Sequence, residues 1–173
     1  MNDNLRILYL IGLAVLLGWL AWQVFRQVRR NVGVEGVINK LQPKTKDGQA
    51  SAQDYYELGC AYLEKRLYMD ATENFKKALQ ANPEFAEAHN NLGFCHFQQR
   101  QYDLAIREYK DAVRFKPDYV SALNNLGHAL EMKGQAVQAL EAYDQVLTLQ
   151  PANATAERRA RALRKRVPST ADG

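Results

Sequence analysis

The chain has 173 residues, which is enough for one modest domain and an additional segment but excludes a large multidomain enzyme. Its 23 Lys and Arg residues outnumber its 19 Asp and Glu residues, yet the excess lies at the two ends, because residues 52–153 carry 10 basic and 14 acidic side chains. Since phosphates repel such a net negative body, the composition disfavours nucleic-acid binding. The two cysteines, Cys60 and Cys95, match neither a disulfide framework nor a zinc site.

A transmembrane helix over residues 7–25 is the first predicted element, followed by a basic stop that ends the anchor at residue 30. At about 1.5 Å per residue these 19 residues extend about 28 Å, close to the roughly 30 Å thickness of a bilayer's hydrocarbon core. Arg26, Arg29 and Arg30 are expected at the membrane surface, and the positive-inside rule then puts everything after residue 26 on the cytoplasmic side. A cleavable signal peptide is the alternative, but its apolar core usually has only about 7 to 15 residues.

Residues 31–51 are predicted to link this anchor to the remainder of the chain. Four apolar residues there have the spacing of one helical face, which favours a short amphipathic turn on the membrane surface or against the following domain: Val34, Val37, Ile38 and Leu41. Pro43 is expected to end that turn, and the polar residues after it are expected to form a flexible joint.

An interval of 34 residues recurs throughout residues 52–153. The residues that repeat at this interval are a Leu-Gly pair, an alanine, an aromatic residue and a proline: Leu58 and Gly59, Leu92 and Gly93, Leu126 and Gly127; Ala71, Ala105 and Ala139; Phe75, Tyr109 and Tyr143; Pro83, Pro117 and Pro151. The pattern resembles the tetratricopeptide repeat. The resemblance implies an all-α solenoid of three repeats, 52–85, 86–119 and 120–153, each with two antiparallel helices that bury their apolar faces only by stacking.

Local signals predict how these helices begin and end. The turn inside each repeat favours a left-handed residue, which is Gly134 in the third repeat but Arg66 and Arg100 in the first two. Asn82 is expected to cap the helix that follows it, with Pro83 in that helix's first turn.

A basic capping helix over residues 154–167 is predicted to close the stack, with Asn153 as its cap and residues 168–173 as a disordered tail. Its outer face is expected to carry six cations: Arg158, Arg159, Arg161, Arg164, Lys165 and Arg166. These side chains favour a solvated cover over the last repeat, with attraction to anionic lipid or to an acidic partner as the alternative.

No catalytic or metal-binding pattern stands out in the sequence. His89, His96 and His128 form neither an HExxH motif nor a pair four residues apart, and there is no glycine-rich phosphate loop. We therefore expect a protein that is not an enzyme and that holds no cofactor and no metal.

The resemblance also implies where a partner binds, because the first helices of stacked tetratricopeptide repeats line a concave groove. The groove positions of this chain carry amide, aromatic and aliphatic side chains suited to peptide recognition: Tyr56, Cys60, Leu63, Asn90, Asn91, Phe94, Phe97, Asn124, Asn125, His128 and Glu131. For Asn91 and Asn125, a role in joining neighbouring repeats is equally compatible with the sequence. The resemblance also describes a carboxylate clamp of Lys, Asn, Asn, Lys and Arg in chaperone-binding relatives, and its positions fall here on Tyr56, Cys60, Asn91, Ser121 and Asn125. Only Asn91 matches, and the three cations are missing, so binding of chaperone tails is not expected.

The order of the predicted parts is similar to that of the small thylakoid-anchored tetratricopeptide proteins of cyanobacteria and plastids. This resemblance implies a scaffold that assists assembly or stability of photosystem I, with membrane-complex subunits as partners and with its repeats on the cytoplasmic or stromal side. An assembly factor of the bacterial envelope or of cytochrome maturation is the alternative, and a soluble enzyme subunit or lipid-sensing protein is a third reading.

Overall fold

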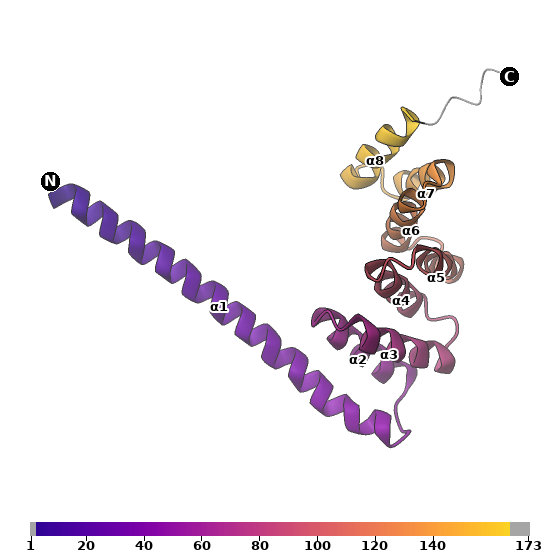
Figure 1. Cartoon of the computed structure of the whole chain (residues 1–173), viewed down its shortest axis with the longest axis horizontal. Coiled ribbons are helices and arrows are strands. Elements are labelled where there is room, and N and C mark those ends of the chain that lie inside the picture. The colour runs from indigo at the N-terminus through magenta and orange to yellow at the C-terminus, as the bar shows by residue number, and fades with distance from the viewer. Residues whose placement is uncertain (1–2, 167–173) are drawn as a thin grey trace. The chain divides into compact units, whose positions relative to one another are not determined.

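The computed structural model describes residues 3–166, and this part of the chain is all-helical (Figure 1). It divides into two compact units, one ending at Lys40 and one beginning at Leu41. The side chains of Arg29 and Arg30, Val167 and the predicted tail at 168–173 lie outside the described part. The all-α solenoid expected from the 34-residue interval is confirmed.

The first helix, α1, runs over Asp3–Lys46 and contains the apolar segment. Within the described residues it is the one helix that is long and apolar enough to cross a membrane, by length and composition. The expected stop at Pro43 is wrong. Pro43 lies in the last turn of α1 and lacks the N–H that would bond the carbonyl of Asn39, but its own backbone oxygen still accepts a bond from Asp47 N at 3.1 Å. The chain leaves the helix instead at Gly48, whose φ of 70° is left-handed.

Seven further helices follow within residues 47–166, and each predicted repeat boundary coincides with the start of a helix. The first helices of the repeats are α2 (Ala52–Glu64), α4 (Ala86–Gln98) and α6 (Val120–Met132), and the second helices are α3 (Tyr68–Ala81), α5 (Tyr102–Phe115) and α7 (Ala136–Leu149). The capping helix α8 covers Ala154–Arg164. Arg66 and Arg100 each have a φ of 59° and Gly134 has a φ of 75°, so the left-handed turn is confirmed in all three repeats.

The prediction for Asn82 is wrong. This residue follows the end of α3, and its Oδ1 accepts a bond from Glu84 N at 3.2 Å within the turn that contains Pro83. Helix α4 begins only at Ala86, so Phe85 occupies the N-cap position without a side-chain cap bond. The same position before α8 is Asn153, and its Oδ1 accepts from Ala156 N at 3.1 Å, as predicted.

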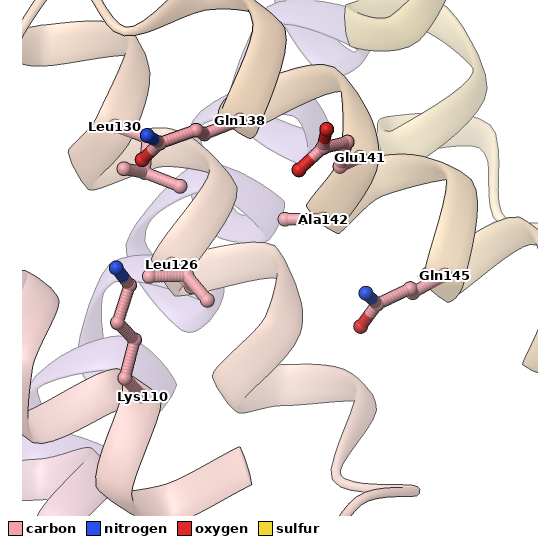
Figure 2. A pocket seen from close by; sticks show the side chains of 7 residues that line it. All are labelled: Lys110, Leu126, Leu130, Gln138, Glu141, Ala142 and Gln145. Carbon is pink, nitrogen blue, oxygen red and sulfur yellow. The ribbon is translucent and has the colours of Figure 1, made fainter.

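Successive first helices contact one another, α2 with α4 and α4 with α6, whereas substantial contact between successive second helices is absent among residues 3–166. The first helices therefore form the inner row of a curved stack. On the opposite side, α5 and α7 leave a cavity of about 240 Å³ whose floor is Leu126 and Leu130 (Figure 2). Ala142 lines this cavity, and the residue one repeat earlier is the larger Glu108.

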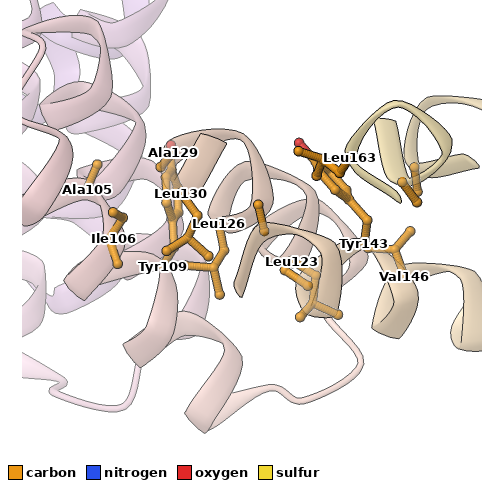
Figure 3. Packing of buried hydrophobic residues seen from close by; sticks show 14 residues of the cluster. Ala105, Ile106, Tyr109, Leu123, Leu126, Ala129, Leu130, Tyr143, Val146 and Leu163 are labelled. Carbon is orange, nitrogen blue, oxygen red and sulfur yellow. The ribbon is translucent and has the colours of Figure 1, made fainter. Parts of the chain in front are cut away.

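Each repeat is held by an aromatic ring packed on a glycine. A β-carbon added to Gly59, Gly93 or Gly127 would lie 2.7 to 2.8 Å from the ring of Phe75, Tyr109 or Tyr143 respectively, so only glycine fits under each ring. Tyr109 and Tyr143 belong to the main buried cluster, which continues through α6 and α7 to Leu163 of α8 (Figure 3).

Helix α8 keeps the register of the first helices. Its N-cap, Asn153, lies 34 residues after Tyr119, which is the N-cap of α6. The buried alanines Ala88, Ala122 and Ala156 follow the same interval and are all fully buried. The capping helix is thus built as the first helix of a fourth repeat.

Candidate functional site

The eleven predicted groove residues all lie on the first helices α2, α4 and α6. Ten of them are half-buried, and Asn90 is 7% exposed. We call the surface that these eleven side chains form the inner face. It combines partial exposure with mixed chemistry, because amides, a thiol and aromatic rings alternate along the inner row of helices.

Hydrogen bonds between side chains tie the three first helices together along the inner face. Asn125 Nδ2 donates to Asn90 Oδ1 at 3.0 Å, Asn90 Nδ2 donates to Asn91 Oδ1 at 3.1 Å, and Asn91 Nδ2 donates to Tyr56 Oη at 3.2 Å. We call this chain of contacts the amide ladder. Asn91 and Asn125 therefore join neighbouring repeats. Both side chains are only half-buried, so they are also accessible to a partner.

Tyr56 begins the amide ladder on α2, and its ring lies 4.7 Å from the ring of Phe85. Burial, together with the neighbouring Cys60, raises the pKa of Tyr56, so the hydroxyl stays protonated. Burial also raises the pKa of the Cys60 thiol. A protonated thiol is a poor nucleophile, so Cys60 is suited to contact rather than to covalent chemistry.

Phe97 and His128 form the apolar part of the inner face between α4 and α6, with ring centroids 4.9 Å apart. Burial and the positive charge of Arg159 lower the pKa of His128, which favours the neutral ring at pH 7. A neutral ring beside a phenyl group can accept an apolar side chain from a partner without desolvating a charge.

Glu131 connects α6 to the helices that follow it. Its Oε2 accepts one bond from Tyr143 Oη at 2.9 Å and another from Arg159 Nη1 at 2.6 Å. The expectation that Arg159 belongs to the outer face of the capping helix is therefore wrong. The sequence does contain a signal for this position, because Arg159 follows Asn125 by the same 34 residues that separate Asn125 from Asn91.

His89 makes a different contact, between α4 and α5. Its Nδ1 lies 2.9 Å from Glu108 Oε2, and its Nε2 lies 3.0 Å from the backbone oxygen of Pro83. Both partners are acceptors, so the ring satisfies them only when both nitrogens carry protons. Burial lowers the pKa of His89, but these two bonds outweigh it and raise the pKa above its usual value.

The carboxylate of Glu108 is charged in this arrangement. Burial raises its pKa, but His89 and Arg107 outweigh burial and lower it. Ligand atoms of His89, Glu108 and Asp111 lie within 4.8 Å of one another, which is compact enough for a metal ion. Arg107 already bonds Glu108, however, and Arg114 bonds Asp111 at 3.1 Å, so both carboxylates are engaged by arginines of α5 itself, while the His89–Glu108 contact joins α4 to α5.

Comparison with known proteins agrees with this architecture. The tetratricopeptide repeat family model matches residues 56–120 and 96–154, which together cover more than half of the chain. The chain belongs to the tetratricopeptide repeat family. Among curated proteins, this tetratricopeptide repeat protein is 32% identical over 79 residues to the uncharacterized protein ycf37 of Guillardia theta. That match covers 46% of the chain and only 44% of the relative.

Solved tetratricopeptide structures share the fold. MamA is 24% identical with a TM-score of 0.74, and the similarity covers 79% of this chain and 75% of MamA. The first repeat domain of Spaghetti (RPAP3), bound to an HSP90 peptide, is 23% identical with a TM-score of 0.65 and coverages of 67% and 92%. The second repeat domain of human RPAP3, in complex with an HSP70 peptide, is 20% identical with a TM-score of 0.61 and coverages of 64% and 92%.

Proposed function

We propose that this protein is a membrane-anchored scaffold that binds a segment of another protein along the inner face and performs no chemistry. The observation that carries the proposal is the composition of that face, where the amide ladder lies beside the half-buried rings of Phe94 and Phe97. Such a surface can hydrogen-bond an extended backbone and accept apolar side chains. Spaghetti and human RPAP3, which share the fold, hold chaperone peptides in their structures.

The partner in this proposal is a subunit of a membrane complex, with photosystem I favoured. The support is the order of the parts: an apolar segment at residues 7–25, cations directly after it, and then the repeats, as in the thylakoid-anchored tetratricopeptide proteins. An anchor raises the effective concentration of the inner face near nascent membrane complexes without any additional contact. Arg26, whose guanidinium lies 5.5 Å from the ring of Trp22, is placed at the membrane surface in this scheme.

A pull-down of the full chain from mild-detergent extracts of thylakoid membranes tests the proposal. Wild type and a control variant, Val137→Ala, are expected to retain photosystem I subunits, because Val137 is 55% exposed on a second helix. The variant Phe94→Ala with Phe97→Ala is expected to lose them while keeping its helical circular-dichroism signal. Equal recovery with all three proteins would reject the inner face as the binding site.

The alternative, an assembly factor of the bacterial envelope or of cytochrome maturation, differs in topology because its repeats would face the periplasm. Cys60 is half-buried on the inner face, whereas Cys95 is 0% exposed and burial raises its pKa to about 11, so only Cys60 can report topology in the folded protein. In sealed vesicles whose outer surface is the cytoplasmic or stromal face, a membrane-impermeant maleimide is expected to label Cys60 directly, with Cys60→Ser as the blank. Labelling only after permeabilisation would favour the periplasmic alternative.

A third possibility is a soluble enzyme subunit or lipid-sensing protein in which the apolar segment does not span the bilayer. Carbonate washing distinguishes it from the proposed anchor. A spanning helix keeps the chain in the membrane pellet, whereas release into the supernatant would favour the soluble reading.

A further inference from the structure

Arg159 occupies an inner-row position that the sequence pattern assigns to an amide. In α4 and α6 the sixth residue of the repeat is Asn91 or Asn125, and each donates a hydrogen bond toward the preceding repeat. Because α8 keeps the same register, Arg159 is the sixth residue of the fourth first helix. It therefore lies at the α8 end of the row of helices that carries the inner face.

Glu131 and Tyr143 fix the position of this guanidinium. Arg159 Nη1 bonds Glu131 Oε2 at 2.6 Å, and the same oxygen accepts the hydroxyl of Tyr143. The Arg159 side chain is 33% exposed against 18% for Glu131, so solvent reaches the guanidinium more readily than its carboxylate partner. A guanidinium has five N–H donors in a planar fork, and the contact with Glu131 uses a single nitrogen among the described atoms.

A buried acceptor beside this position has no partner. In the second repeat, Asn90 Oδ1 accepts the amide of Asn125, the sixth residue of the following helix. The equivalent oxygen in the third repeat is Asn124 Oδ1, which is buried and is the one such side-chain atom without a hydrogen bond within the described residues. The sixth residue that would have satisfied it is Arg159, which bonds Glu131 instead. The amide ladder therefore ends at α6, and a cation occupies the next equivalent position on α8.

We infer that Arg159 forms a carboxylate-binding subsite at the α8 end of the inner face, so that a bound protein segment places an Asp, Glu or chain-terminal carboxylate there. This inference rests on the proposed function and names the chemistry of one end of its ligand. The remaining N–H groups of the fork suit a carboxylate. The local charge agrees, because residues 154–166 carry six cations and a single carboxylate, Glu157. This subsite differs from the chaperone clamp, whose cations would come from α2 and α6 and are missing there.

Glu131 competes with the ligand for the same guanidinium, so substitutions of the two residues are expected to change the affinity for an acidic segment in opposite directions. Removing the cation with Arg159→Gln is expected to weaken binding of an acidic segment. Removing the internal competitor with Glu131→Gln is expected to strengthen it, because the amide leaves Arg159 a full positive charge. Arg158→Gln is the matched control, since Arg158 is exposed on the same helix, has no ion pair among the described residues, and loses the same charge.

The experiment uses the full chain in phosphatidylcholine nanodiscs at about 0.15 M salt, where charges more than about 8 Å apart are largely screened. The probes are two fluorescein-labelled octapeptide libraries with a fixed central Phe, one ending in Asp-Glu with a free carboxylate and one ending in Asn-Gln amide. Anisotropy titrations are expected to show about tenfold tighter binding of the acidic library to wild type and to Arg158→Gln, as a charge-assisted bond implies. Arg159→Gln is expected to bind both libraries alike, and Glu131→Gln to prefer the acidic library more than wild type does.

Four results would overturn the inference. If wild type binds both libraries equally, peptide binding by the inner face is supported and the carboxylate-binding subsite is rejected. If neither library binds, both the proposed peptide binding and the subsite are rejected. Equal losses in Arg158→Gln and Arg159→Gln would mean that the cations of α8 act only through their summed charge. Binding of phosphatidylserine liposomes that Arg159→Gln abolishes, without any preference between the libraries, would assign Arg159 to lipid. Thermal unfolding of each variant, followed by circular dichroism, shows that it is folded.

Discussion

Replacement of Arg66 and Arg100 by glycine is expected to stabilise the protein. Both residues have a φ of 59°, and both backbone N–H groups make the same turn bond as Gly134, at 2.9 Å to the residue three positions earlier. The left-handed conformation costs a residue with a β-carbon about 1–2 kcal/mol. Glycine removes this cost but gives the unfolded chain more freedom, which costs about 0.4–1 kcal/mol.

The expected net gain is about 0.5–1 kcal/mol for each substitution, and the double variant is expected to gain about the sum. In a protein of this size, one kcal/mol corresponds to a shift of roughly 2–4 °C in the unfolding midpoint. The reverse change, Gly134→Arg, is expected to lower the midpoint by a similar amount, because Gly134 has a φ of 75° and open space around it. Thermal unfolding of the full chain, followed by far-ultraviolet circular dichroism, measures all three changes. Lower midpoints for both glycine variants would refute the reasoning and would mean that the arginine side chains contribute more than the turns cost.

Three further changes test the packing, the capping and the ion pair. Gly93→Ala is expected to cost about 1–3 kcal/mol of stability in urea unfolding, because its β-carbon would lie 2.8 Å from the Tyr109 ring, and an unchanged midpoint would contradict that contact. Ser51→Ala is expected to cost about 1 kcal/mol, since the Ser51 hydroxyl caps α2, and the same assay detects it. The raised pKa of His89 means that its contribution to stability is complete below its unfolded pKa of about 6.5 and is lost as the pH rises through the folded value. Wild type should therefore be less stable at pH 8.5 than at pH 6, and His89→Gln should show a smaller difference; equal pH dependence would rule out His89 as the cause.

The repeats were predictable from the sequence because several independent residues carry the same interval. Gly93 and Tyr109 are examples: both recur at this interval, and the ring of Tyr109 packs so closely on Gly93 that a β-carbon at position 93 would not fit. The errors lie where one residue type serves several roles. Asn82 before a proline fits an N-cap, but the chain needs a turn of three further residues before α4 begins, and no local signal gives that length.

The candidate site was only partly predictable for a related reason. The interval places Asn91, Asn125 and Tyr56 on one row of helices, but it does not reveal that their side chains bond one another. That outcome depends on distances between helices, which the packing of the whole stack sets. Arg159 was assigned to solvent because cations on a capping helix are usually solvated, and only the contact with Glu131 overrides this expectation.

The amide ladder and the cavity between α5 and α7 give the two sides of the stack different mechanical properties. Directional bonds fix the spacing of the first helices, while α5 and α7 flank an open hollow of about 240 Å³. We therefore expect bending of the stack to cost least where it closes or widens that hollow, with the row of asparagines as the hinge line. A partner held along this row would feel little of the motion, since the displacement is greatest on the side that it does not touch.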